Sequence, residues 1–497
     1  MNSRLLICCS AFALFAGCTT VPKPLTPTEL DTKAEANYAK VDADQEPVGA
    51  PIDMYEAMAR GLKYNLDYKV EMMEESLKTR ELNLSRYDML PQLVASAGYA
   101  GRSNYSGASS LSLLTRRQSL EPSTSSEKNL YTADLTLSWD VLDFGLSYVR
   151  SQQRADEVLI SQERRRKVAN RIVEDIRTSY WRAVSAQRLL DKLQQLEASV
   201  STTLNNSERL AERRLSAPLT ALTYQRELIE IQAEIRRLQR ELVVAKAQLA
   251  ALMNLKPGTE FTLVLPDRNQ TLPAVQYTGE DMMMTALKNR AELREVSYRQ
   301  RINAKELDAA LLSALPSLRG VLGVNVDSNS FLYNNDWFSL GARASWNVLN
   351  LFRLPAQKKA VKAQDNLLQQ RELALTMAVI TQVHVARARY GHLNQELETA
   401  SHQMRVQDKI LYQIRSGFKA GAMSQQTLLR EEMNTLVSEV KYDIAYAEAQ
   451  NSYANLFASM GIDDFSPDIT GREDVTTLKT SLSTLWQNRE NAIKLGQ

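Results

Sequence analysis

Residues Leu137–Gly145 read LSWDVLDFG, and residues Ala344–Phe352 repeat this wording as ASWNVLNLF. Upstream of each copy, apolar and polar residues alternate with a period of two, which is typical of a strand with one apolar and one polar face. From about Gly145 to Leu215, by contrast, neither proline nor glycine interrupts the chain. At about 1.5 Å per residue, this run predicts roughly 100 Å of helix. The quoted stretch therefore marks a passage from a strand into a very long helix.

Other stretches repeat in the same order, about 200 residues apart. Leu90–Leu93 (LPQL) returns as Leu315–Leu318 (LPSL), and the 14 residues from Arg214 align with those from Phe418. This spacing far exceeds the 20–50 residues of a solenoid repeat. The sequence thus indicates one unit, duplicated once.

Each half predicts helices, a strand pair and two long helices. The predicted helices of the first half are 52–65, 66–90, 145–215 and 219–254, and those of the second half include 355–420 and 424–460. Gly421 suits the left-handed residue after a helix, and Ser424 suits an N-cap. Four strands of about ten residues cannot close a barrel or form a large two-sheet core. They suit a barrel assembled from several chains.

Apolar or small residues recur along the first long helix at alternating steps of three and four, the pattern of a coiled-coil seam. Glu197 is the one exception in it. The seam positions are Ile172, Ile176, Ser179, Ala183, Ala186, Leu190, Leu193, Val200, Leu204, Ser207 and Ala211.

The N-terminus has the features of a secretion signal. Arg4 is the only charged residue among the first 22, and a run of about twelve apolar residues precedes Gly17 and Cys18. That run is too short to span a bilayer as a helix. Its end, LFAGC, resembles the bacterial lipoprotein cleavage signal, which predicts that Cys18 becomes the acylated first residue. Thr19 favours sorting to the outer membrane, and the alternative is an ordinary signal peptide with an incidental cysteine.

Composition excludes several classes of function. The net charge of +2 gives no basis for nucleic-acid binding, and the basic run Arg164–Lys167 (RRRK) is interpreted as a solvated part of the long helix. The only histidines, at 384, 392 and 402, lack the spacing of a helical metal pair. A P-loop and a GxGxxG motif are absent. We expect no enzyme activity, no cofactor and no metal.

The signal, the duplication, the two strand pairs and the unequal helices together resemble the TolC-type outer-membrane factors. The resemblance implies a mainly α fold with a small β part: a homotrimer whose twelve strands form an outer-membrane barrel, continued by a periplasmic helical barrel. It also implies a periplasmic adaptor and an inner-membrane transporter as partners. We divide the chain into a signal peptide (1–17), a lipid-anchored extension (18–50), a first repeat (51–259), a linker (260–280), a second repeat (281–460) and a C-terminal segment (461–497). The linker and the C-terminal segment would form a belt around the tunnel.

The resemblance also suggests site residues. Polar residues of the strands would line the barrel lumen: Thr132, Asp134, Thr136, Ser138, Arg343, Ser345 and Asn347. Relatives close the periplasmic tip with a charged network, whereas the matching positions here are Leu222, Thr223, Phe418 and Met423, which favour an apolar closure. Arg213, Arg214 and Lys419 are candidates for adaptor contact, or are simply solvated. The connections 105–128 and 327–336 would be extracellular loops.

Two alternatives stay open at this point. A structural coiled-coil lipoprotein of the envelope would share the helices but would not need lipid-facing strands. Within transport, WDVLDFG favours type I secretion and the lipoprotein signal favours efflux of small molecules, while polysaccharide export is a third possibility. The sequence does not identify the exported substrate.

Overall fold

The protein is described by a computed structural model that covers residues 22–41, 43, 45–119, 121–212, 218–256, 258–267, 275, 277–462 and 469–492. Cys18, the signal peptide, Arg213 and Arg214 lie outside these described residues, as do parts of the linker and of the C-terminal segment. Within the described ranges, no helix is both long enough and apolar enough to cross a membrane.

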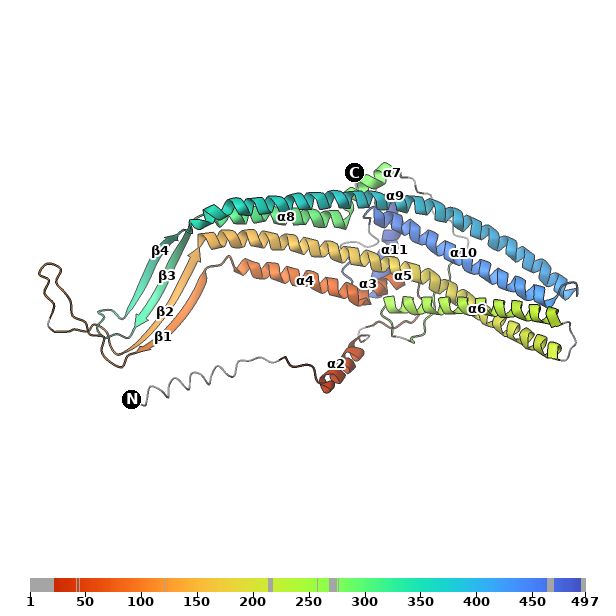
Figure 1. The fold of residues 1–497 in the computed structure, drawn as a ribbon, viewed down its shortest axis with the longest axis horizontal. Coiled ribbons are helices and arrows are strands. Elements are labelled where there is room, and N and C mark those ends of the chain that lie inside the picture. Colours follow the sequence, from red (N-terminus) through yellow and green to blue (C-terminus); the bar gives the residue numbers. More distant parts are fainter. Residues whose placement is uncertain are drawn as a thin grey trace.

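The chain contains one six-element unit twice, which confirms the predicted duplication. The long helices have 72 and 71 residues, and each is followed by a helix of 35 residues. Figure 1 shows the strands at one end of the molecule, the helical turns at the other, and α3, α7 and α11 near the middle. The first unit comprises α3 (Met54–Tyr64), α4 (Leu66–Tyr87), β1 (Gln92–Gly101), β2 (Asn129–Asp140), α5 (Val141–Glu212) and α6 (Pro218–Leu252). The second comprises α7 (Gly279–Asn289), α8 (Ala291–Leu312), β3 (Ser317–Asp327), β4 (Asp336–Ser345), α9 (Leu349–Lys419) and α10 (Gln425–Ser459).

The four strands form one antiparallel sheet in the order β1-β2-β3-β4. The pair β2–β3 joins the two repeats, with Leu137 opposite Leu322. Among the described residues, β1 pairs only with β2 and β4 only with β3, so that the sheet ends in two open edges of ten residues each. Such edges present unpaired backbone groups and favour pairing with another chain.

Two further helices frame the repeats. α11 (Val475–Ala492) follows the second repeat, and α2 (Pro27–Lys40) lies in the extension, where no helix was predicted. Thr26 and Glu29 form a reciprocal capping box around Pro27, which occupies the first helical position. The short stretch TPTE was therefore a helix signal that the proline-rich composition of this region obscured.

The start of α9 was also predicted wrongly. Gly421 (φ +71°) and the N-cap Ser424 end and begin their helices as expected. However, α9 begins at Leu349, so that Pro355 lies inside it. Asn350 donates from Nδ2 to the carbonyl of Ser313 at the end of α8, 2.9 Å away. This contact stabilises the first turn of α9. Pro355 itself has no backbone N–H to donate within the helix.

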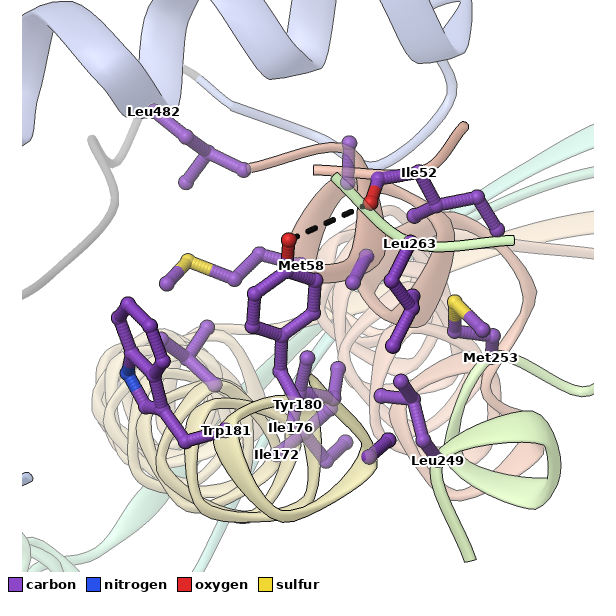
Figure 2. Packing of buried hydrophobic residues seen from close by; sticks show 14 of the residues in the cluster. Ile52, Met58, Ile172, Ile176, Tyr180, Trp181, Leu249, Met253, Leu263 and Leu482 are labelled. Atoms are coloured by element: carbon purple, nitrogen blue, oxygen red, sulfur yellow. Dashed lines mark hydrogen bonds between the residues drawn. The ribbon is translucent and has the colours of Figure 1, made fainter. Parts of the chain in front are cut away.

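The main core lies halfway along the helices, where α3, α5, α11 and the linker meet. Figure 2 shows Met58 of α3, Tyr180 of α5 and Leu482 of α11 in this cluster. The Tyr180 hydroxyl donates to the carbonyls of Ile52 (3.3 Å) and Val264 (3.0 Å). Segments from three parts of the sequence are thus fixed to the middle of α5.

A second core lies along the C-terminal half of α5. At three places the buried residue precedes the predicted seam position by one. Leu189, Leu196 and Thr203 are the buried residues, while their predicted neighbours Leu190 and Leu204 are only partly buried. α5 packs against both α6 and α10, which also contact each other, so that the buried face of α5 is wider than a seam with a single partner. Glu197 is no exception inside the seam, because its carboxylate faces α6 and accepts from Arg236 at 3.0 Å.

Candidate functional site

The polar residues of the strands gather on one face of the sheet. Cross-strand partners share a face, and the register pairs Thr132 with Asp327 and Asp134 with Asn325. The face therefore contains six of the seven residues predicted for the lumen: Thr132, Asp134, Thr136, Ser138, Arg343 and Ser345. The seventh, Asn347, was assigned to the strand wrongly, because β4 ends at Ser345.

The opposite face of the sheet is apolar and open. Phe338 and Leu340 of β4 are more than four-fifths exposed, and Leu93 of β1 is also exposed. An exposed apolar face that extends across several strands is rare on a monomer in water and marks an interaction surface. The sheet thus has one polar and one apolar face.

The aspartate of the SWD stretch explains the step from strand to helix. Asp140 ends β2, and its Oδ1 accepts the backbone N–H groups of Leu142 (2.9 Å) and Asp143 (3.3 Å), which caps α5. Its other oxygen faces the Arg319 guanidinium of β3 at 3.5 Å. Asn347 occupies the matching place before α9. One side chain therefore starts the helix and ties it to the sheet.

The two tryptophans at these steps serve as packing residues. Trp139 contacts Phe144 edge to face, with ring centroids 5.6 Å apart. Trp346 donates from Nε1 to the carbonyl of Ala314, 3.0 Å away, at the end of α8. Both side chains also remain half exposed, as aromatic residues at a membrane interface do.

The basic run of α5 is not simply solvated, which corrects the sequence interpretation. Arg165 pairs with Glu75 at 3.1 Å, and Arg166 donates to the carbonyls of Asn289 (3.0 Å) and Gly461 (2.7 Å). These carbonyls lie at the C-terminal ends of α7 and α10, where cations are favourable. We call the group Arg166, Asn289, Arg290 and Gly461 the repeat junction, because it binds the ends of α7 and α10 to α5.

The linker lies along α5 through backbone contacts. The Gln187 amide donates to the Leu263 carbonyl at 2.9 Å and accepts the Leu263 N–H at 2.7 Å. Arg188 donates to the carbonyl of Pro266. Together with Tyr180, these side chains hold residues 263–266 by their main chain.

A buried cation anchors the C-terminal helix. The Arg177 guanidinium lies 3.5 Å from the ring centre of Trp486 in α11 and donates to the Gln450 carbonyl at 3.2 Å. Burial lowers the pKa of Arg177 to about 9. A stacked arginine is a strong contact when desolvated, so that α11 is fixed to α5 and α10 at this point.

The four predicted tip residues lie on two separate hairpins, and none is buried. Phe418 and Met423 flank the turn between α9 and α10 and are 38% and 42% exposed. A Cβ at Gly417 would lie 2.7 Å from Met423 Cγ, so that Met423 folds back over this glycine. Leu222 is exposed on α6, and the Thr223 hydroxyl donates to its own helix. Lys419 is exposed in the last turn of α9.

A polar cluster near the tip was missed by sequence reasoning. Glu227 of α6 accepts from both Gln426 and Arg430 of α10, and Gln425 donates to Thr203 of α5 at 3.1 Å. The hydrogen bond from Gln426, followed by that from Arg430, lowers the pKa of Glu227. We call Glu227, Gln426 and Arg430 the hairpin latch, since they connect the two hairpins. A cavity of about 570 Å³ lies beside the latch, between α5, α6 and α10.

Residues 72–255, from α4 to the end of the first long hairpin, match the family described as outer membrane efflux protein. The chain thus resembles outer membrane efflux proteins over most of its first repeat. This family consists of channel proteins and not of enzymes. No curated protein matches the chain in sequence. Among the described residues, no three His, Cys, Asp or Glu side chains gather into a possible metal site.

Solved channels share the fold over most of their length. The Campylobacter jejuni CmeC outer membrane channel has 14% identity and a TM-score of 0.62, covering 94% of this chain and 99% of its own. The open state of the Neisseria gonorrhoeae MtrE outer membrane channel has 16% identity and a TM-score of 0.61, covering 89% and 98%. CusC has 16% identity and a TM-score of 0.61, covering 85% and 96%. At these identities, the likeness concerns the fold alone.

Proposed function

We propose that three copies of the chain form an outer-membrane channel that continues as a tunnel through the periplasm. The observation that carries this proposal is the four-stranded sheet, with two open edges, one polar face and one exposed apolar face. Pairing β4 of one copy with β1 of the next closes twelve strands, which buries both edges and turns the apolar faces toward lipid. A structural lipoprotein would have no use for such a sheet.

We further propose that the channel serves efflux of small molecules in a tripartite system, with a periplasmic adaptor and an inner-membrane transporter. The description of the matching family supports efflux over type I secretion. Lys419, with Arg213 and Arg214, would contact the adaptor. A strain that lacks the protein should retain a fluorescent efflux dye, and the intact gene should restore export. Normal dye export together with loss of a secreted protein would reject the efflux proposal.

Purified protein is expected to be a trimer. Light scattering in detergent, corrected for bound detergent, should give close to three times the mass of one mature chain. A stable monomer with full helix content would contradict the proposal, because the sheet edges of a single chain stay open.

The mature protein is expected to begin at an acylated Cys18, since this residue ends the stretch LFAGC and no later cysteine exists in the sequence. Intact-protein mass spectrometry should show loss of the first 17 residues and the added mass of lipid. Cys18→Ser should lose the lipid but still enter the membrane through its strands. A mature chain that keeps Met1 would refute this processing.

Arg343 is expected to favour anions in the lumen. It lies directly opposite Arg319 on the polar face, and Arg319 is the one paired with Asp140. Like charges in register cost stability, so that this pairing calls for a compensating role. Arg343→Gln should lower the ratio of anion to cation permeability severalfold, measured as reversal potential in a salt gradient. Arg343→Lys keeps the charge and should keep the ratio. Equal ratios in all three proteins would exclude the role.

A further inference from the structure

The connection between β1 and β2 is an ordered hairpin, not an irregular loop. Figure 1 shows it reaching well beyond the ends of the strands. Antiparallel bridges pair Ala108 with Ser123 and Leu111 with Gln118. Its backbone is thus fixed far from the rest of the fold.

This hairpin holds two neighbouring leucines in the open. Leu113 and Leu114 are 91% and 96% exposed. The turn that carries them is closed by hydrogen bonds from Ser112 N–H to the Arg117 carbonyl (2.9 Å) and from Arg116 N–H to the Ser112 carbonyl (3.0 Å). Arg116 adopts φ +53°, an unfavourable conformation for a residue with a side chain. An ordered turn that displays two leucines is suited to insertion into an apolar phase.

The same turn is positively charged. Arg116 and Arg117 follow the leucines after a single residue, Thr115, and are exposed. The sequence has no Asp or Glu between Arg102 and Glu121, so that the tip has no internal counter-charge. Leucines next to arginines match the boundary between acyl chains and phosphate-bearing headgroups.

We propose that the tip, Leu113–Arg117, docks into the phosphate-bearing glycolipid surface of the outer leaflet. The leucines enter the acyl boundary, and the guanidinium groups bind phosphate oxygens. The inference rests on the proposed channel, which puts this end of the sheet at the outer surface. The tip would then brace the barrel against the lipid around it.

Docking of the tip onto another copy is disfavoured by charge. Threefold symmetry would bring three pairs of arginines together without an acidic residue on the same turns, and this repulsion is strong in a confined space. An anionic lipid surface instead neutralises each tip separately.

The test uses the full-length channel in lipid nanodiscs with an environment-sensitive fluorophore at Thr115→Cys. Discs contain either zwitterionic phospholipid alone or added diphosphorylated glycolipid, together with a lipid-borne quencher. Emission should shift to the blue and be quenched as glycolipid is added. Arg116→Gln with Arg117→Gln should raise the half-saturating glycolipid fraction by roughly twenty-five-fold, at about fivefold for each basic residue. Leu113→Ser with Leu114→Ser should abolish the quenching.

The second loop supplies the matched control, since Asn334→Cys is exposed on a turn without neighbouring arginines. Its emission should not respond to the glycolipid. If the label at residue 115 stays exposed to water in every lipid mixture, the inference is wrong. The same result is expected if the tip binds a protein partner instead of lipid. Conductance in planar bilayers is measured on the same preparations. A conducting channel whose label stays exposed to water rejects only the docking of the tip, whereas loss of conductance rejects the channel proposal itself.

Discussion

Gly461→Ala is expected to destabilise the protein by several kcal/mol, whereas Gly421→Ala should cost only roughly 1–2 kcal/mol. Both glycines follow a long helix with nearly the same φ, +72° and +71°. Around Gly421 an added Cβ meets no atom within 4 Å. At Gly461 it would lie 2.7 Å from the carbonyl carbon of Asn289 and 2.9 Å from the nitrogen of Arg290. Those atoms are backbone and cannot rotate away, so that overpacking adds about 1–3 kcal/mol.

Thermal unfolding followed by circular dichroism, at a fixed scan rate, provides the comparison. The pair isolates the close contact, because the conformational penalty is common to both variants. Arg166→Ala should also lower the midpoint, as it frees the two carbonyls that the repeat junction holds together. Equal midpoints for the two glycine variants would show that α7 and α10 do not meet as tightly as the structure indicates.

The sequence predicted the repeated elements because each one is set by local pattern. Alternation in residues 131–139 determines a strand, and the absence of glycine and proline in 145–215 determines a helix. The misassigned seam has a different origin. Leu189 and Leu190 are both apolar, and only the placement of α6 and α10 against α5 decides which is buried. Local pattern cannot choose between two apolar neighbours.

The candidate site divides in the same way. The polar face of the sheet follows from the alternation with period two, and six of the seven residues expected in the lumen lie on it. The repeat junction was missed, because Arg166 binds backbone carbonyls 123 and 295 residues away. Every residue has a backbone carbonyl, so that no residue type in the sequence marks one as the partner of an arginine. A charged run on a helix is therefore interpreted as solvated when the neighbouring elements are unknown. The hairpin latch was missed because Glu227 and Arg430 belong to different repeats.

The second large effect is expected at the periplasmic tip, for which we propose an apolar closure. In a trimer, the half-exposed Phe418 and Met423 of three copies would meet around the axis and bury their remaining surface. A fully buried large apolar side chain contributes about 1.5–3 kcal/mol, and partial exposure at a tip reduces this. Phe418→Ala and Met423→Ala should each raise the single-channel conductance of the trimer. Because no charge is removed, the increase should vary with salt only as bulk conductivity does.

The hairpin latch is a competing means of closure within each copy. Glu227→Gln removes the charge that Gln426 and Arg430 approach. Since the pKa of Glu227 is lowered in the folded protein, the latch stabilises at neutral pH and weakens as the pH falls through that lowered pKa. If the latch holds the tip closed, Glu227→Gln should raise conductance at neutral pH, and high salt should have a similar effect on the wild type.

Planar-bilayer recordings at two salt concentrations distinguish the two means of closure. An apolar gate predicts higher conductance for Phe418→Ala and Met423→Ala, with Glu227→Gln near wild type. Met423→Asp should open it further, because three like charges around the axis repel each other and high salt screens this added effect. Leu222→Ala, on the other hairpin, tests whether the ring includes α6. If both alanine variants conduct like wild type while Glu227→Gln conducts more, closure is electrostatic and the apolar gate is wrong. If none differs from wild type, the tip does not limit conductance, and the constriction lies elsewhere along the tunnel.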